Sequence, residues 1–455
     1  MLRQDVTGEN TSVPIARTRF QLRRSTASGT RPPTHRYNLR SLSGGKIDKS
    51  QPEANGASKV SGKNNTDPEA PAIVQTVDAM TDVIKALWLG DVDKRRGQNP
   101  NISACPGTST PSGLATAPRN STVRTTFLLV SDTHTIEPSL PHDVYSPFRT
   151  PFPRANVFIH AGDLTNRGTF KALKRAVSWI TEIPAELKII IAGNHDWRLD
   201  AAYWASATDS DVDGSDDERA ERERESRQCK EYLTSDAMKK KGIWYLEDEV
   251  REFTLSNGAR FTVLASPCTP RGVYPHDSGS FRYEPAAKHY WHAKFPLASL
   301  PEQVHVAITH TPPYKMHDQV SAGLNAGCPQ LLRFLRDVRP QLSVCGHIHE
   351  AAGAKLVTWE RLNDKGDRTA LAERDLRPEI KKVETPEGGI FSDITGLTRG
   401  LMDGEQTLFV NASIAGSGGR AGRSPVMVEL ELPYHEVGEH ESVGEIQRGT
   451  TAPLV

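Results

Sequence analysis

Five short stretches of this sequence end a run of apolar residues with side chains that can bind a metal ion. The first, L-L-V-S-D-T-H, brings Asp132 and His134 to the end of an apolar run. Because side chains alternate along a strand, residues two apart face the same side, so these two can meet at one site. The other four stretches, each rich in β-branched residues as strands of an α/β sheet are, lie at 157–163, 189–196, 306–310 and 342–349.

The candidate ligands in these stretches are all oxygen or imidazole donors. They are Asp132, His134, Asp163, Asn194, His310, His347 and His349. A set without thiolates suits Mn, Fe, Zn or Mg rather than a structural zinc site. So many side chains exceed the needs of one tetrahedral ion, but they suit two ions if Asp163, on a tight Gly-Asp turn, bridges them. Two ions about 3.5–4 Å apart can share a hydroxide near neutral pH and also bind phosphate oxygens.

The segments between these stretches alternate helix and strand. Thr169 is expected to cap a helix whose apolar face includes Phe170, Leu173, Val177 and Ile180. A strand resumes at 188–191, which completes the strand–helix–strand unit of a parallel sheet. A second helix is expected from Pro329, because proline is favoured at the first helical position. Further strands are expected at 252–255, 261–266, 408–411 and 426–430.

Composition divides the chain into a tail, a folded domain and a second tail. Residues 1–123 are rich in Ser, Thr, Pro and Arg and poor in large apolar residues, which predicts a disordered segment. A short helix at 73–89 could bind a partner protein or pack without one. The folded domain spans 124–433, and residues 434–455 are expected to be loose. Two polar inserts, of which the first is predicted as a solvated loop, interrupt the domain at 205–227 and 358–405.

Charge and cysteine usage exclude several classes of protein. Residues 1–125 hold 18 Lys and Arg against 10 Asp and Glu, and the remainder holds 38 against 46, which is too balanced to favour nucleic-acid binding. Five scattered cysteines without a C-x-x-C pair favour reduced thiols. No apolar run reaches the roughly 18 residues needed to span a bilayer. We expect an intracellular, cytoplasmic protein. Targeting to an organelle by the Arg- and Ser-rich residues 1–47 is the alternative.

In this order, D-x-H, G-D, G-N-H-D, T-H and G-H-x-H resemble the motifs of the calcineurin-like metallophosphoesterase superfamily over about residues 125–432. The wider stretches look most like its metallophosphoesterase-domain-containing (MPPED) group. The resemblance implies a four-layer α/β/β/α sandwich with two metal ions at the ends of its central strands. It also implies one ion held by Asp132, His134, Asp163 and His349, and another held by Asp163, Asn194, His310 and His347.

The resemblance further implies roles for two residues beside the ligands. His195 would contact the scissile phosphate and donate a proton to the leaving oxygen. Arg167 stands where phosphoprotein phosphatases carry an arginine that clamps phosphate. Two positions depart from those phosphatases, since Ala192 replaces a second arginine and Asn166 replaces the aspartate that partners the catalytic histidine. Both departures favour a phosphodiesterase over a protein phosphatase.

The expected function is therefore hydrolysis of a small phosphodiester, such as a cyclic nucleotide, by a hydroxide that two divalent ions share. Mn is the preferred metal, with Fe, Zn or Mg as alternatives. A phosphomonoesterase or protein phosphatase is the second hypothesis. The third is a regulatory protein of low activity that acts through its tail and inserts. The sequence predicts no oligomeric state.

Several other residues are assigned to the framework or left open. Histidines outside the motifs are expected to be packed or exposed rather than ligating: His160, His276, His289, His292, His305 and His317. His289 and His292, with Tyr290 and Trp291 between them, are also considered as a wall for a base. Asn411 is expected near the site. Residues 416–422 are predicted as a hairpin loop, because no G-K-[ST] follows to make a phosphate loop.

Overall fold

The computed structural model describes residues 121–206, 216–271, 279–285, 287, 289–359, 370–401, 403–416 and 420–436. The predicted helix at 73–89, nearly all of the N-terminal tail and residues 437–455 therefore lie outside the described residues.

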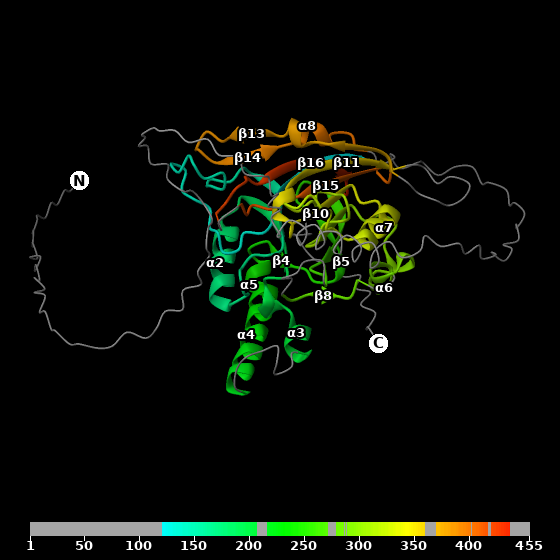
Figure 1. The fold of residues 1–455 in the computed structure, drawn as a ribbon. Helices are drawn as coiled ribbons and strands as arrows, with labels where there is room; N and C mark the ends of the chain where they lie inside the picture. Colours follow the sequence, from blue (N-terminus) through cyan, green and yellow to red (C-terminus); the bar gives the residue numbers. More distant parts are fainter. Residues whose placement is uncertain are drawn as a thin grey trace, which may run out of the picture. The chain divides into compact units, whose positions relative to one another are not determined.

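The described residues form two seven-stranded sheets (Figure 1). The order in the first sheet is β13 (Lys381–Glu384), β14 (Ile390–Asp393), β16 (Val426–Pro433), β1 (Thr122–Val130), β2 (Ala155–Ala161), β3 (Ala185–Ile191), β4 (Ile243–Tyr245). The order in the second is β12 (Ala370–Asp375), β11 (Gly353–Trp359), β15 (Gln406–Asn411), β10 (Leu342–Cys345), β9 (Val306–Thr309), β6 (Arg260–Ser266), β5 (Glu249–Thr254). Two short strands, β7 (Thr269–Pro270) and β8 (Arg282–Tyr283), pair separately.

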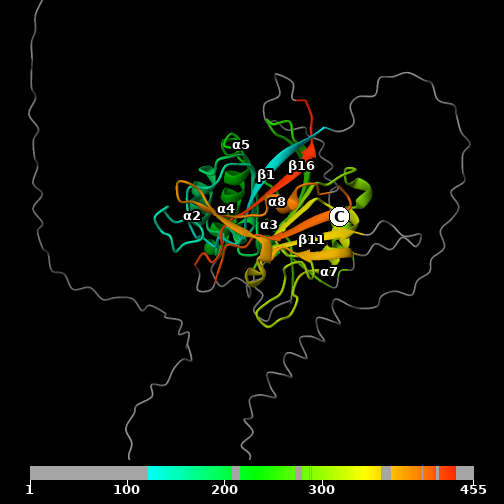
Figure 2. The same cartoon turned by 90° about the horizontal axis from the view of Figure 1, so that it is seen from above.

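The centre of each sheet is parallel. Strands β1, β2, β3 and β4 run parallel in the first sheet, and β6, β9, β10 and β15 run parallel in the second. Antiparallel β16 lies beside β1, as Figure 2 shows from above. The carboxyl ends of parallel strands meet at one edge of their sheet, so residues that follow these strands gather there.

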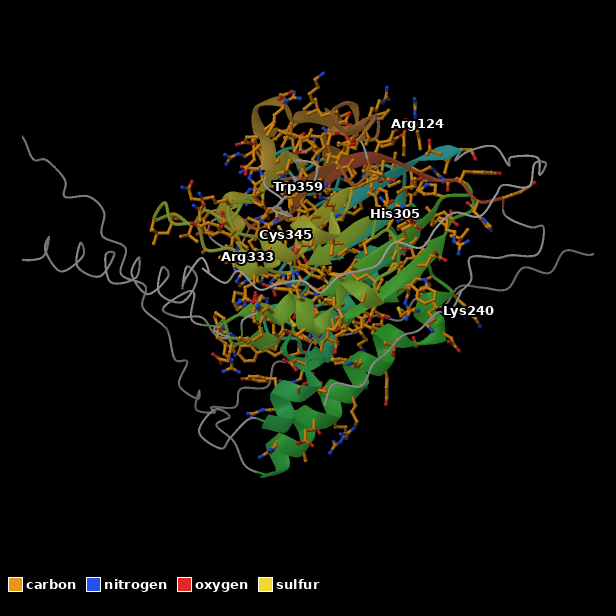
Figure 3. The ribbon with its side chains drawn as sticks, turned by 90° about the vertical axis from the view of Figure 1, so that its right-hand side faces the viewer. Arg124, Lys240, His305, Arg333, Cys345 and Trp359 are labelled. Carbon is orange, nitrogen blue, oxygen red and sulfur yellow. The ribbon has the colours of Figure 1, made fainter. Side chains whose placement is uncertain are left out.

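Apolar residues on both faces of the strands produce three cores. In β1, Phe127 and Leu129 belong to the core between the sheets, whereas Leu128 and Val130 belong to the core under the helices of the first sheet. Phe409 of β15 belongs to a third core on the outer face of the second sheet, where it packs edge-on against Trp359 of β11. Trp359 is labelled in Figure 3. Two sheets with helices outside both confirm the predicted four-layer architecture.

Helices cover both outer faces, with α2 and α4 on one side and α6 and α7 on the other (Figure 1). The Thr169 side chain caps α2 (Phe170–Thr181) as predicted, since its hydroxyl accepts a hydrogen bond from the Ala172 N–H at 3.4 Å. Helix α7 (Pro329–Val338) begins at the expected proline. The remaining helices are α3 (Ala201–Ser206), α4 (Asp216–Thr234), α5 (Asp236–Lys239), α6 (Tyr290–Lys294) and α8 (Thr395–Thr398), with 3₁₀ turns η1 (Trp197–Leu199), η2 (Leu297–Ser299), η3 (His349–Ala351) and η4 (Arg377–Glu379).

The prediction of a solvated loop through 205–227 is wrong for residues 216–227, which form the first part of α4. Its polar sequence has no apolar stripe, but Arg219 and Glu223 pair one turn apart at 3.7 Å, and Glu225 pairs with Arg198 at 3.0 Å. The end of the helix buries Cys229 and Leu233 against the first sheet. Packing at that end holds a helix that its own polar sequence does not suggest.

The second polar insert, 358–405, also contains regular structure. It supplies β12 to one edge of the second sheet, and β13 and β14 to one edge of the first. Edge strands are partly open to water and therefore tolerate the charged residues that make this segment polar.

None of the helices in the described ranges combines the length and apolar character needed to cross a bilayer. The four cysteines of the described part, Cys229, Cys268, Cys328 and Cys345, are free and buried, in keeping with the prediction of reduced thiols. Cys345 lies in the last position of β10 (Figure 3), two residues before a predicted ligand.

Candidate metal centre

The seven predicted ligands follow the carboxyl ends of central strands in both sheets. Asp132 and His134 follow β1, Asp163 follows β2 and Asn194 follows β3. From the second sheet, His310 follows β9, and His347 and His349 follow β10. We call these seven residues the candidate metal centre. Each sheet supplies part of it, so the centre depends on how the two sheets pack.

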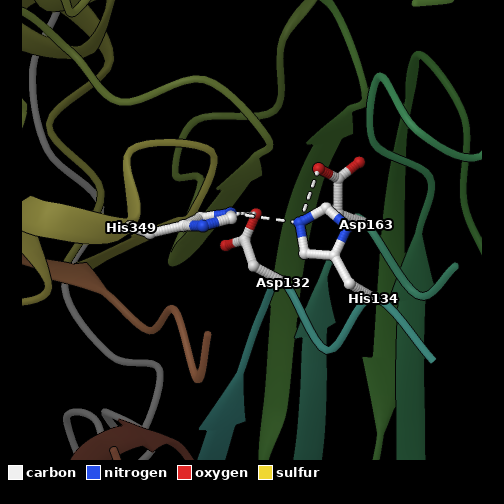
Figure 4. Close-up of side chains that lie close together, drawn as sticks. All are labelled: Asp132, His134, Asp163 and His349. Carbon is white, nitrogen blue, oxygen red and sulfur yellow. Dashed lines mark hydrogen bonds and ion pairs between the residues drawn. The ribbon is translucent and has the colours of Figure 1, made fainter. Parts of the chain in front are cut away.

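One half of the centre brings together two carboxylates and two imidazoles. One ligand atom from each of Asp132, His134, Asp163 and His349 lies within 4.8 Å of all the others (Figure 4). The His134 and His349 Nε2 atoms are 3.1 Å apart, and these atoms lie 3.5 Å from Asp163 Oδ2 and 3.4 Å from Asp132 Oδ1, respectively. Two imidazole nitrogens this close need a proton or a cation between them, and the adjacent carboxylates favour a cation.

The other half lies around His310, which is fully buried. Its Nε2 is 3.1 Å from Asn194 Oδ1 and 3.4 Å from Asp163 Oδ2. Its Nδ1 lies 2.9 Å from the Ala161 carbonyl oxygen, which can only accept, so Nδ1 carries a proton and Nε2 is the nitrogen that would face a metal. The His347 ring completes this half, with its centroid 5.1 Å from that of His310.

Asp163 faces both halves. Its Oδ2 lies 3.5 Å from His134 Nε2 and 3.4 Å from His310 Nε2, while its Oδ1 accepts a hydrogen bond from the His195 N–H at 2.8 Å. Oxygen and imidazole donors without thiolates suit divalent Mn, Fe, Zn or Mg. The residues therefore fit a site for divalent metal ions, with one carboxylate shared between the halves.

The electrostatics of the centre favour the metal-binding protonation states of Asp132 and His347, but not that of His310. Burial alone would raise the pKa of Asp132, but the hydrogen bond and charge of His349 hold it well below its usual range. Burial, together with the charge of His310, lowers the pKa of His347 to about 3. Burial would also lower the pKa of His310, but the charge of Asp163 outweighs it and raises that pKa to about 9. Ionised carboxylates and a neutral His347 are the forms that coordinate cations, and a cation would displace the proton of His310.

The backbone of the centre is strained. Asp132, His134, Asp163 and His347 have φ angles of 54°, 44°, 54° and 66°, in the left-handed region that costs about 1–2 kcal/mol for an L-residue. Hydrogen bonds compensate, because the Asp132 N–H donates to the Gly162 carbonyl and the His134 N–H to the Asp163 carbonyl, each at 3.0 Å. Left-handed residues at successive strand ends turn the ligands towards one place, a use of strain that is common at functional sites.

Gly193 is required by the close approach of two loops. A Cβ atom at this position would lie 2.3 Å from Asp163 Oδ1 and 2.6 Å from His310 Cε1. Any other residue would therefore push the shared carboxylate out of place.

Asp196, which the sequence did not single out, joins the loop after β2 to the loop after β3. Its fully buried carboxylate accepts hydrogen bonds from the N–H groups of Gly193, Leu164 and Thr165 and from the Thr165 hydroxyl, at 2.8–3.1 Å. These bonds fix the positions of Asp163 and Asn194. Its place at the end of G-N-H-D was visible in the sequence, but its burial was not.

His195 lies beside the first half of the centre. Its ring centroid is 4.9 Å from that of His134, and its Nδ1 is 3.2 Å from the backbone carbonyl oxygen of Asn166. The sequence comparison left this histidine without a carboxylate partner, and the Asn166 carbonyl occupies that role in the structure. Arg167 is exposed and does not line the cavity next to the centre, so its role as a phosphate clamp stays a prediction.

That cavity has a volume of about 860 Å³ and opens beside His134, His195 and His349. Its other walls come from the segments after β1, β2 and β15. They are formed by Thr135, Ile136, Ser139, Asp143, Tyr145, Ser146, Asn166, Ala415, Gly416, Arg420 and Ala421. Residues 416 and 420–422 flank positions outside the described residues, so the predicted hairpin there is described only at its two ends.

The histidines outside the motifs occupy framework positions where they are described. His160 is buried with its Nε2 3.0 Å from the Thr133 hydroxyl, and His292 pairs with Asp337 at 3.0 Å. Between His289 and His292, Trp291 of α6 is fully buried in the third core. His289 and His292 are not among the described residues that line the cavity beside the centre.

Asn411 lies close to the centre, as expected, but it acts on the backbone. Its buried Nδ2 donates to the His317 carbonyl at 3.0 Å and to the Ile348 carbonyl at 2.9 Å. Because Ile348 stands between two predicted ligands, this amide fixes the loop that carries both of them.

Residues 125–351 match the family model for calcineurin-like phosphoesterases. This part of the chain belongs to that family, and the order of its motifs and its two-sheet fold agree with the match.

Among curated proteins, human metallophosphoesterase domain-containing protein 1 is 31% identical over 231 residues, which are 50% of this chain and 62% of the relative. The probable rhamnogalacturonate lyase C of Emericella nidulans is 31% identical over 233 residues, which are 51% of this chain and 18% of that protein. The chain thus spans less than two thirds of either relative. A solved phosphopantetheinyl hydrolase from Mycobacterium tuberculosis is 17% identical, with a TM-score of 0.31 over 54% of this chain and 87% of that one.

Proposed function

We propose that this protein is a metal-dependent phosphodiesterase with two metal ions, acting on small phosphodiesters such as cyclic nucleotides. The position of Asp163 carries the proposal. Its Oδ2 lies within 3.5 Å of an imidazole nitrogen from each half of the centre, as a carboxylate shared by two ions requires.

The chain would divide its ligands around that carboxylate. Asp132, His134 and His349 would hold one ion, Asn194, His310 and His347 would hold the other, and Asp163 would contact both. Two bound divalent ions supply positive charge for the phosphate oxygens and lower the pKa of a water nucleophile. Mn is the metal we would try first, and Fe, Zn or Mg suit the same donors.

His195 is proposed as the proton donor to the leaving oxygen. The Asn166 carbonyl accepts from Nδ1, which orients the ring. The Nε2 side of the ring is then left to deliver a proton where negative charge develops. Because His195 lines the cavity, a substrate there can reach it.

A diester is favoured over a monoester by the charge around the cavity. A bound diester carries one negative charge at neutral pH, whereas a monoester carries nearly two. Arg420 is the one arginine among the described residues that line the cavity, and Ala192 stands where protein phosphatases carry another. This supply of positive charge matches the diester.

The proposal is tested by comparing hydrolysis of bis-p-nitrophenyl phosphate and p-nitrophenyl phosphate by the purified, Mn-loaded protein. We expect faster cleavage of the diester. His195→Ala should lower kcat about 10²- to 10⁴-fold for diesters with poor leaving groups, and less for p-nitrophenyl esters, which need little proton donation. Metal content should not change, because the contact from residue 195 to Asp163 is made by the backbone N–H. Two bound metals without turnover of either ester would instead support a regulatory role.

A further inference from the structure

The segment that follows His134 forms one wall of the cavity and differs from an ordinary surface loop. Of the five large apolar side chains that are strongly exposed among the described residues, three lie in it: Leu140, Val144 and Tyr145 are 62%, 64% and 93% exposed. Ser139, Asp143, Tyr145 and Ser146 from this segment also line the cavity. We call residues 139–146 the arm wall.

The cavity is large enough for a substrate much bigger than phosphate. A volume of about 860 Å³ lies near the upper end of the range of pockets that enclose drug-sized ligands. The candidate metal centre borders only one side of this space, so a phosphate held there leaves most of it unfilled. The remaining space fits the organic group that stays esterified to this phosphate. We call this group the arm of the ester, and it would lie against the arm wall.

The arm wall offers an aromatic ring and an unpaired carboxylate. Tyr145 presents its ring to solvent, where it can stack on a flat ring of a ligand. In the described part of the chain, no cation pairs with Asp143, whose carboxylate can accept hydrogen bonds from N–H or O–H groups. Ser139 and Ser146 add hydroxyl groups. Together these residues suit an arm that carries both a flat ring and hydrogen-bond donors.

The two ends of the arm wall are joined by backbone hydrogen bonds, and the buried side chain of Arg149, which is 3% exposed, holds the segment in place. The Ser139 N–H donates to the Phe148 carbonyl, and the Thr150 N–H to the Ser139 carbonyl, each at 2.9 Å. Arg149 donates to the Ser146 carbonyl at 3.0 Å, to the Gly388 carbonyl at 2.5 Å and to Glu384 at 2.9 Å. The last two acceptors belong to the β13–β14 hairpin of the second polar insert. Through Arg149, this hairpin therefore holds the arm wall in position. A wall that is already ordered costs less entropy when a ligand binds.

We propose that the arm wall binds the organic arm of the phosphodiester and selects arms with a flat ring that bears N–H or O–H donors. Tyr145 would stack on the ring and Asp143 would accept its donors, while Arg149 positions the segment that carries both. This proposal rests on the proposed function, because the same cavity must also place the phosphate at the candidate metal centre.

The test compares two p-nitrophenyl esters that share a leaving group, one with a thymidine 5′-phosphate arm and one with a methyl phosphate arm. For the full-length Mn-loaded protein, kcat/KM should favour the thymidine ester. Tyr145→Ala should lower that preference about tenfold, in line with the loss of one stacked base. Asp143→Asn should also lower the preference. Tyr434→Ala removes a tyrosine that is 47% exposed and does not line the cavity, and it should leave both rates unchanged.

Binding of thymidine 5′-monophosphate and methyl phosphate, measured by calorimetry, separates failure of this inference from failure of the proposed function. Turnover of both esters with the same preference in wild type and Tyr145→Ala would overturn the arm wall and leave the phosphodiesterase intact. Absence of turnover, together with tighter binding of thymidine 5′-monophosphate that depends on Tyr145, would overturn the phosphodiesterase and retain the wall. Equal binding of both phosphates by the wild type would again overturn the wall.

Discussion

The two oxygens of Asp163 have different partners, and this division explains why a single residue can organise the centre. Oδ1 accepts the backbone N–H of His195, while Oδ2 faces His134 and His310. A substitution that keeps the shape of the side chain but removes its charge should therefore affect both halves of the centre.

Asp163→Asn should reduce the number of bound metal ions from two to none or to weakly held traces, because the amide cannot supply a shared negative oxygen. Asn194→Ala is the matched comparison, since the Asn194 Oδ1 lies 3.1 Å from His310 Nε2 in the second half, and its loss should leave the ion of the first half in place. Metal content after dialysis, measured by mass spectrometry, distinguishes the two variants. Two ions retained by Asp163→Asn would exclude the shared role of this carboxylate.

His305, away from the centre, makes stability depend on pH. It is 7% exposed (labelled in Figure 3), its Nδ1 accepts the Thr262 N–H at 3.0 Å, and burial lowers its pKa to about 4. In the unfolded chain this histidine has a pKa of about 6.5. As the pH falls from 6.5 to 4, the unfolded chain therefore binds a proton that the folded chain does not bind, which lowers the unfolding free energy.

His305→Gln keeps an acceptor for Thr262 but removes this titration. Between pH 7 and pH 5 the wild type should lose about 2 kcal/mol more unfolding free energy than the variant. Urea unfolding at both pH values measures the difference. Equal losses in the two proteins would show that His305 is protonated as readily in the folded state as in the unfolded chain.

Strand ends, rather than whole strands, determine the geometry of the site. The sequence predicted which strands end in ligands because each apolar run stops at a recognisable donor, as β1 does before Asp132 and β10 before His347. It did not predict the left-handed φ angles at those residues, the burial of Asp196 or the support of the arm wall by the β13–β14 hairpin. Arg149 and Gly388 are 239 residues apart, and local patterns do not reveal such contacts.

Asn411 at the end of β15 allows a test of how one strand end supports another. Asn411→Ala removes three hydrogen bonds. It leaves the buried His317 and Ile348 carbonyls without this donor and the Ser413 N–H without this acceptor, which should lower the unfolding free energy by about 2 kcal/mol. Because the loop with His347 and His349 would loosen, Mn affinity should fall as well. Calorimetric titration with Mn measures that affinity, and an unchanged value would mean that the loop is held by other contacts.

At the scale of the whole folded domain, the packing of the two sheets brings the two halves of the centre together. Core residues from both, such as Phe127 of β1 and Phe261 of β6, meet edge-on with ring centroids 5.7 Å apart. The four-layer fold could be predicted because the motifs and the apolar runs agree along most of the domain. Helix α4 could not, because its first turns lack apolar residues and depend on contacts at its far end.

The proposed activity depends most on two metal ions acting together across the two sheets. The most direct measurement adds Mn stepwise to the metal-free, full-length protein and follows hydrolysis of bis-p-nitrophenyl phosphate. We expect little activity at one equivalent and a maximum close to two, since both halves of the centre must be filled. Maximal activity at one equivalent, or none at any Mn concentration, would contradict the proposal of a phosphodiesterase with two metal ions.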